Sequence, residues 1–463
     1  MRRSAYLAVL TVIVGALLAW WPAATPPVQA APNKPADLAQ AGPYAVGHLS
    51  LMLFDASRPG DRPGEATYNG VSRPIPVSVW YPVDPATVEG RASDAVYPLD
   101  PLYGVAPDTY SPQWEAYGID PAFEQAVPSA AKPFPLLVFS PGWGGPNWIH
   151  TSLGTRLASH GFVVAVPYHF GDQWWLWEPP YDPLAVASYN RPRDVTFVLD
   201  DLLARNQAAG DLLNGLIRPH QVAAGGWSLG GYAAMALAGG DDLVCDTLYG
   251  IPGLEDPPDW TCAPTDPDPR IKAITPLDGS NQVLHFAELA RITVPALGIG
   301  EEWDAVLDWQ ARQHAAFSGH PAYRVDVAAT NHQSFSDICE AAQLGVDSGI
   351  FPELGESMLA MFCTPDFTPS GVVHELTGKY VAAFLTTQLA GEPGYQAVLT
   401  PGWAIAREQL VEFFVTERRS PQSIDDDWPG LFVYFPHQPG SLQARGPKDP
   451  SEKRPVNRLS LVQ

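Results

Sequence analysis

The sequence predicts an α/β fold with a mostly parallel central sheet, helices on both of its faces and long loop insertions. Runs that are apolar throughout, such as 134–140 and 294–300, are typical of strands buried on both faces. Segments with helical periodicity, such as 193–205, separate these runs along the chain. A serine in the glycine-rich turn 226–231 stands between one such run and an alanine-rich helix. Together these observations favour one catalytic sheet rather than several small domains.

The expected elements alternate in the order that a parallel sheet requires. Two strand-like segments come first, 46–54 and 75–83, and the second has the period of two typical of an antiparallel pair. The later expected strands are 134–140, 162–167, 221–227, 271–277, 294–300 and 323–328. The expected helices are 152–160, 193–205, 230–238 and 311–317. Residues 84–132 have little periodicity, so we expect a long surface excursion that could cover the active site.

Charge and composition exclude one class of function. The chain has 463 residues, 46% of them hydrophobic and 17% charged, which is ordinary for a globular protein. Its formal net charge is −23 and its sequence pI is about 4.7. Such a field repels phosphate backbones, so nucleic acid is excluded as an expected partner.

The first thirty residues have the pattern of a secretory signal peptide. Arg2 and Arg3 precede an apolar run from about Ala5 to Trp21, and small residues follow up to Ala30. We expect cleavage near Ala30 and a secreted or periplasmic protein; an uncleaved membrane anchor is the alternative. No later stretch has the roughly twenty apolar residues needed to span a bilayer. The expected organisation is a signal peptide (1–30), a catalytic domain with insertions (31–417) and a loosely ordered extension (418–463).

Four cysteines follow the expected cleavage site, an even number in an exported chain. Nearest-neighbour pairing joins Cys245 to Cys262 and Cys339 to Cys363, although three connectivities are possible. No two cysteines have the close spacing of zinc sites. We therefore expect disulfides rather than a metal.

The strongest local motif is Gly-Trp-Ser-Leu-Gly-Gly at 226–231. A serine at a strand-to-helix turn is held in a strained conformation, and glycines two residues before and after it leave room for that turn. The N-terminus of the following helix presents oriented N–H groups and positive partial charge where an oxyanion develops. Ser228 is therefore the candidate nucleophile.

A serine hydroxyl needs a base, usually a histidine oriented by a carboxylate. His332 follows the last expected strand, which is where the base stands when the order is Ser, acid, His. Two aspartates compete for the third role, because Asp278 ends one late strand and Asp304 follows the next. The usual position of the acid, after the later strand, favours Asp304.

Backbone N–H groups should complete the site. The turn Pro-Gly-Trp-Gly-Gly at 141–145 follows the strand 134–140, where the oxyanion loop of such enzymes lies. The N–H groups of Trp143 and of Leu229, the residue after the serine, are the candidate donors to an oxyanion. This chemistry needs no metal and no organic cofactor.

These segments resemble the platelet-activating factor acetylhydrolase family and its bacterial relatives, which include lipases and polyester-active hydrolases, over about Ile75 to Asp337. The most specific pieces are PVSVWYP (76–82), PFPLLVFSPGW (133–143), LASHGFVVAV (157–166), the Ser228 turn, LDG (277–279) and HQSFSD (332–337). The resemblance implies the α/β-hydrolase fold and favours Asp278 as the acid, because relatives carry it in the LDG segment. It also implies that Trp143 and Leu229 hold the oxyanion positions.

The chain departs from that pattern in the oxyanion loop, at the serine turn and in its insertions. Relatives usually have His-Gly where this chain has Pro141-Gly142, and a histidine where it has Trp227. Insertions at about 84–132, 172–190 and 241–269 should reshape the cleft, so the family's substrate does not transfer.

The sequence therefore predicts a secreted serine carboxylic-ester hydrolase acting on a small-molecule, lipid or polymeric ester. An acyltransferase or a peptidase could use the same triad, and an inactive binding protein could keep the fold. The sequence does not indicate the acyl length, the alcohol or the oligomeric state.

Overall fold

A computed structural model describes residues 38, 40–59, 72–95, 97, 121–172, 182–250, 256–279, 283–302, 304–349 and 352–416. The expected signal peptide (1–30) and C-terminal extension (418–463) lie outside these residues. Within the described residues, no helix combines the length and the apolar character needed to cross a membrane.

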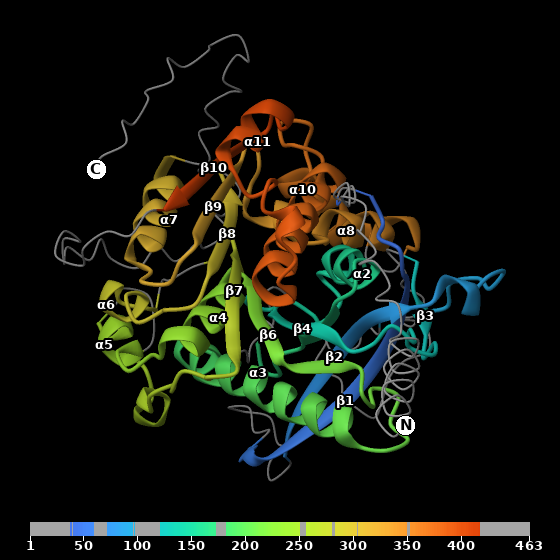
Figure 1. Ribbon diagram of the computed structural model, residues 1–463. Coiled ribbons are helices and arrows are strands. Elements are labelled where there is room, and N and C mark those ends of the chain that lie inside the picture. Colours follow the sequence, from blue (N-terminus) through green and yellow to red (C-terminus); the bar gives the residue numbers. More distant parts are fainter. Residues whose placement is uncertain are drawn as a thin grey trace, which may run out of the picture. The chain divides into compact units, whose positions relative to one another are not determined.

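The described chain forms a ten-stranded sheet in the order β10-β9-β8-β7-β6-β4-β5-β2-β1-β3 (Figure 1). The strands are β1 (Ala45–Pro59), β2 (Ser72–Val83), β3 (Phe123–Glu124), β4 (Phe134–Ser140), β5 (Val163–Pro167), β6 (Ile217–Trp227), β7 (Ile271–Leu277), β8 (Ala296–Glu301), β9 (Ala322–Val327) and β10 (Val411–Thr416). The run from β5 through β4, β6, β7 and β8 to β9 is parallel, whereas β2 and β10 are antiparallel to their neighbours. The prediction of a mostly parallel α/β sheet is confirmed.

Helices cover both faces of this sheet. The longer ones are α2 (Thr151–Ser159), α3 (Leu184–Gln207), α4 (Leu229–Gly239), α7 (Asp304–Ala316), α8 (Ile338–Asp347), α9 (Pro352–Phe362) and α10 (Ser370–Leu385). The short ones are η2 (Pro85–Thr87), α5 (Val244–Leu248), η6 (Asp259–Cys262), α6 (Phe286–Leu289), η7 (His332–Phe335), η8 (Thr386–Ala390), η9 (Pro393–Tyr395) and α11 (Pro401–Arg407).

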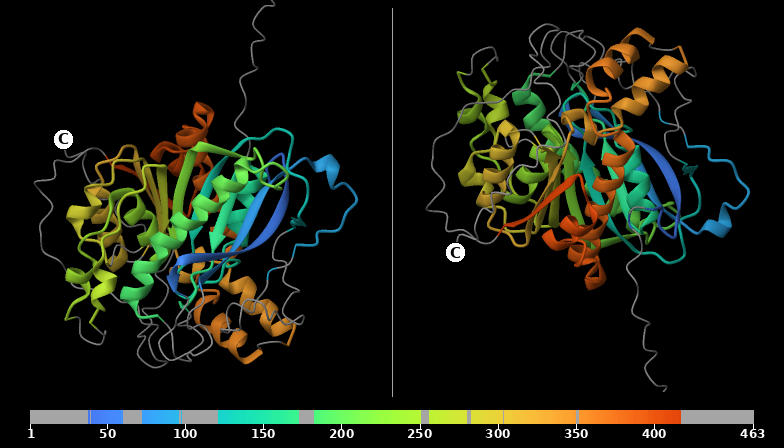
Figure 2. Two further views of the ribbon diagram at one scale, coloured as in Figure 1. Left: turned by 90° about the horizontal axis from the view of Figure 1, so that it is seen from below. Right: turned by 90° about the horizontal axis from the view of Figure 1, so that it is seen from above.

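Alternate side chains of the central strands pack into two separate hydrophobic cores, one on each face of the sheet. On β4, Leu136 and Val138 pack with α3 and α4, whereas Leu137 and Phe139 pack with α2 and α10. Figure 2 shows the two helical layers on opposite sides of the sheet. Because helices cover both faces of the sheet, a ligand-binding site is expected at the carboxyl ends of the parallel strands.

Three regions differ from the sequence interpretation or were not covered by it. Residues 184–190, expected in a loop insertion, form the start of α3, and Pro192 lies inside that helix. The described parts of the 84–132 excursion lie along β1 and β2: β3 pairs with β1, and Tyr81 donates to the carbonyl of Ala126. The helices α8 to α11 and strand β10 had no counterpart among the expected elements.

Candidate active site

Ser228 occupies a strained turn between β6 and α4. Its φ is 56° and its ψ is −123°, a conformation that a non-glycine residue adopts only when its surroundings impose it. A Cβ on Gly226 would lie 2.2 Å from the backbone of Gly230, and one on Gly230 would lie 1.9 Å from the carbonyl oxygen of Ser140. Both glycines are therefore required for the turn, and the serine side chain remains half-buried rather than enclosed.

Asp278 and His332 come together although 54 positions separate them. The Nδ1–H of His332 donates to Oδ2 of Asp278, and Gln310 donates to Oδ1 of the same carboxylate at 2.9 Å. Asp278 follows β7 and is 6% exposed, and His332 begins η7 after β9. Asp304, the alternative acid, begins α7, and its side chain lies outside the described set. The geometry therefore joins His332 to Asp278.

A second carboxyl group lies close to this pair. Glu301 ends β8, and burial, together with the charge of Asp278, raises its pKa well above the usual range. Burial beside Asp278 therefore favours the protonated form of Glu301.

Hydrogen bonds with other parts of the chain hold the segment that carries His332. The side chain of Asn331 accepts from the N–H of Gln333 at 2.9 Å and donates to the carbonyl of Phe362 at 2.9 Å. The indole N–H of Trp227 donates to the carbonyl of His332 at 2.9 Å, and the two rings lie 5.0 Å apart at 33°. Trp227, which stands where relatives have histidine, thus supports the imidazole from the serine turn itself.

The candidate oxyanion residues lie at the expected junctions. Trp143 is in the turn after β4, and Leu229 is the first residue of α4. A Cβ on Gly142 would lie 2.4 Å from the ring of Trp227, so the turn packs directly against the residue that precedes the serine.

Sequence reasoning missed Arg191, a fully buried arginine on α3. Its guanidinium donates to the carbonyl oxygens of Pro141 and Gly142 and forms an ion pair with Asp172. Burial lowers the pKa of Arg191 and raises that of Asp172 to about 7. No familiar sequence pattern marks this arginine, because its role depends on a contact 49 positions away.

An apolar pocket adjoins these residues. About 700 Å³, including open solvent at its mouth, is bounded on one side by the turn after β4, Trp227 and Gln333. The other side is a hairpin of α8 and α9, which we call the 338–363 hairpin. Its pocket-lining residues are Ile338, Leu354, Ser357, Met358, Met361 and Phe362. Figure 2 shows this hairpin projecting from the layers of the sheet.

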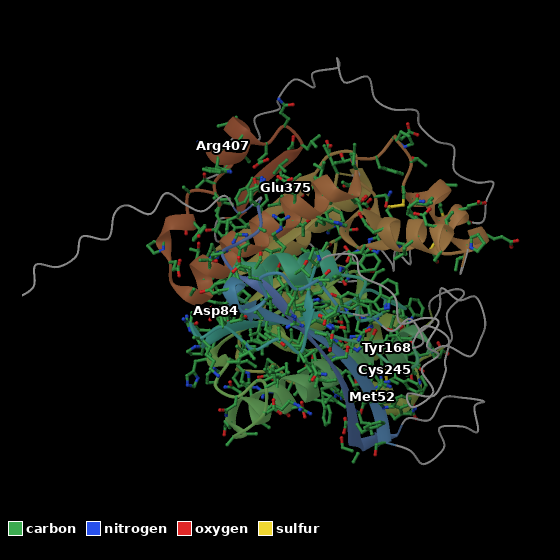
Figure 3. The ribbon with its side chains drawn as sticks, turned by 90° about the vertical axis from the view of Figure 1, so that its right-hand side faces the viewer. Met52, Asp84, Tyr168, Cys245, Glu375 and Arg407 are labelled. Carbon is green, nitrogen blue, oxygen red and sulfur yellow. A yellow bond between two sulfur atoms is a disulfide. The ribbon has the colours of Figure 1, made fainter. Side chains whose placement is uncertain are left out.

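Both nearest-neighbour disulfides are present. Cys245 bonds to Cys262, and Cys339 bonds to Cys363 at the base of the hairpin. Figure 3 shows sulfur atoms, drawn in yellow, among the orange helices that include α8 and α9. The predicted pairing is confirmed.

The described residues include one group with the composition of a metal site. Possible ligand atoms of Asp337, Glu340 and His374 lie within 4.8 Å of one another. Asp337, however, already accepts hydrogen bonds from the backbone and hydroxyl of Ser152, and Glu340 accepts one from Ser370. We therefore describe it as a polar cluster beneath the hairpin, in which Asp337 is buried and Glu340 and His374 are half-buried.

This fold, with a serine on a strained strand-to-helix turn and a histidine–aspartate pair after later strands, defines an α/β-hydrolase. Residues 119–173 match the family described as platelet-activating factor acetylhydrolase, isoform II. A ferulic acid esterase from Streptomyces cinnamoneus has a similar structure, with a TM-score of 0.52 and 22% identity over 81% of this chain and 97% of the esterase. A comparison with curated proteins found no significant match.

The comparisons confirm the predicted resemblance and fold. The structural likeness, at 22% identity, establishes the fold, and the family match supports a hydrolase of the esterase or lipase type. The match to the family covers 119–173, a shorter stretch than the 75–337 over which the sequence pieces resemble it.

Proposed function

We propose that this protein is a serine carboxylic-ester hydrolase that acts through Ser228, His332 and Asp278. The observation that carries the proposal is the His332–Asp278 hydrogen bond, which lies at the carboxyl ends of β7 and β9 in the sheet whose strand β6 leads into the strained turn of Ser228. A carboxylate on Nδ1 leaves Nε2 of the imidazole free of a proton, which is the form that a general base requires.

In the proposed reaction, Nε2 of His332 takes the proton of the Ser228 hydroxyl as its oxygen attacks the ester carbonyl carbon. The tetrahedral oxyanion is held by the N–H groups of Trp143 and Leu229. The C–O bond to the alcohol then breaks, and the alcohol leaves with the proton carried by His332. Water, deprotonated by the same imidazole, releases the acid from Ser228 and completes the cycle.

The two disulfides are compatible with an extracellular protein. We propose that 1–30 acts as the signal peptide, that 31–417 forms the catalytic domain and that 418–463 is an extension. N-terminal sequencing of exported protein tests the first point, with a new terminus near Ala31 expected.

The test is hydrolysis of p-nitrophenyl acetate, butyrate and octanoate, together with labelling by a fluorophosphonate. Wild type should hydrolyse at least one ester, and Ser228→Ala should lose both activity and label. Ser318→Ala, which changes an exposed serine whose hydroxyl donates to the carbonyl of Ala290, is the matched control. Equal hydrolysis by wild type and Ser228→Ala would contradict the assignment. Amide substrates and added alcohols test the peptidase and acyltransferase alternatives in the same assay.

A further inference from the structure

The 338–363 hairpin begins six residues after His332, and a disulfide joins its two ends. Cys339 lies in the first turn of α8 and Cys363 immediately follows α9, so their disulfide encloses both helices in one loop. The end of α9 is also joined to the residue before His332, because Asn331 donates to the carbonyl of Phe362. This hydrogen bond attaches the base of the hairpin to the segment that carries His332.

Almost none of the residues of helix α9 is buried. Only Gly355 is buried among its residues, and a Cβ there would lie 2.5 Å from the carbonyl oxygen of Ala342. The glycine therefore lets α9 lie directly against α8. Four apolar side chains of α9 line the pocket, and among them Met358 also packs against the core: Leu354, Met358, Met361 and Phe362. Apolar side chains that face a hollow favour a ligand that removes them from water.

The opposite wall of the pocket belongs to the candidate active site. It includes Trp143, Trp227 and Gln333, the residue after His332. The lining is mainly aromatic and aliphatic with two methionines, which adapt their shape and make favourable contacts with aromatic rings. An apolar lining with few polar groups is typical of sites that bind small organic ligands.

We propose that this pocket binds the acyl group of the substrate and that the 338–363 hairpin sets the preference for medium-chain aliphatic or single-ring aromatic acyl groups over acetyl. The inference rests on the proposed ester hydrolysis. The turn 143–146, which would hold the carbonyl oxygen, forms one wall of the pocket, so a substituent on that carbonyl carbon can extend into it. We assign this substituent as the acyl group, and the first experiment compares it with the alcohol.

The first experiment separates the two sides of the ester. Wild type, Leu354→Gln and Met358→Trp are compared on p-nitrophenyl acetate, butyrate and octanoate, and then on butyl and octyl acetate. We expect kcat/KM for octanoate to fall roughly tenfold or more in both variants, with acetate changed by less than about twofold. Ile405→Gln, which alters an 85%-exposed apolar residue on α11, is the control and should behave as wild type.

Equal losses on acetate and octanoate would overturn the assignment of the hairpin as the acyl selector. A selective loss on octyl acetate would overturn the acyl side of the proposal. The double variant Cys339→Ser/Cys363→Ser provides a further check, because opening the loop should reduce the octanoate-to-acetate ratio while the acetate rate is retained. An unchanged ratio in a hairpin shown to be reduced counts against the proposal.

A binding measurement distinguishes failure of the pocket from failure of the enzyme. Octanamide carries the same acyl chain and is measured calorimetrically against Ser228→Ala protein, with acetamide for comparison. Binding of octanamide that Leu354→Gln weakens supports the pocket even if no ester is hydrolysed. No binding of octanamide by a protein that hydrolyses acetate esters overturns the pocket and leaves the proposed function intact.

Discussion

The guanidinium of Arg191 donates a 2.7 Å hydrogen bond to the carbonyl oxygen of Gly142. In a planar trans peptide the carbonyl and the following N–H point in opposite directions, so this bond turns the N–H of Trp143 away from Arg191. A charged donor holds a carbonyl more firmly than a neutral one does. Arg191 is therefore a positioning residue for the candidate oxyanion donor rather than a group that touches substrate.

Replacing Arg191 should weaken stabilisation of the transition state more than it weakens substrate binding. Arg191→Met should lower kcat by about tenfold to a hundredfold with little change in KM, because an oxyanion donor acts mainly on the developing charge. A boronic acid that mimics the tetrahedral state should lose affinity in parallel. Arg193→Met, on the same helix and bonded to the carbonyls of Tyr189 and Ala263, is the matched control.

Loss of Arg191 also leaves Asp172 buried without its cation, and this destabilises the fold independently. The double variant Arg191→Met/Asp172→Asn removes that charge. It should recover part of the melting temperature without recovering kcat. Recovery of both would show that the arginine acts only through stability.

The contact between Gly142 and Trp227 predicts a second effect on the oxyanion turn. In Gly142→Ala the new Cβ would lie 2.4 Å from the indole ring, so the turn or the ring must move. We expect activity to fall about tenfold or more, with a smaller effect on melting. Gly402→Ala, where a Cβ meets nothing within 4 Å, should change neither quantity.

The two disulfides should differ in their contribution to stability. Cys245 is buried in the core on the α3 and α4 face, and its bond closes a loop of 17 residues. Its removal as Cys245→Ser/Cys262→Ser should cost about 3 kcal/mol of the free energy of unfolding. Cys339→Ser/Cys363→Ser should cost less, because the released helix α9 buries only Gly355. Urea denaturation of the two double variants checks the order, and a larger loss for the second pair would contradict it.

Asp337, the buried member of the polar cluster beneath the hairpin, predicts a pH-dependent stability. Burial raises the pKa of Asp337 to about 7, against the opposing effects of His374 and Ser152. The folded state therefore holds a proton that the unfolded state releases near pH 4, and the stability gained from this proton is present below that pH. It is lost as the pH rises through about 7.

Asp337→Asn cannot lose this proton and isolates the effect. The free energy of unfolding of wild type, minus that of the variant, should decrease between pH 4 and pH 7.5. Buried groups that do not interact with Asp337 contribute equally to both proteins and cancel in the difference. A difference that stays constant with pH would show that Asp337 titrates normally.

Individual residues show which parts of the fold and of the candidate site could be predicted from the sequence. Ser228, the strand ends and the disulfide pairs depend on local pattern, because glycine spacing, apolar runs and cysteine proximity are readable along the chain. Two features could not be predicted in this way. Arg191 acts through carbonyls that are far away in the sequence, and the 338–363 hairpin follows the last expected strand. No element was expected at α9, and only the fold reveals that its apolar residues line a pocket.

The competition between Asp278 and Asp304 is the remaining point at which sequence alone allowed two answers. The Asp278 carboxylate bonds to both His332 and Gln310, so Asp278→Asn would present an amide where the imidazole needs an acceptor. Such a change favours the wrong tautomer and should lower kcat by a factor on the order of 10⁴ with little change in the fold. Asp304→Asn should retain most of the activity. Rates of p-nitrophenyl ester hydrolysis by the two variants, with circular dichroism to verify folding, decide between them. A large loss in Asp304→Asn with a small one in Asp278→Asn would reverse the assignment.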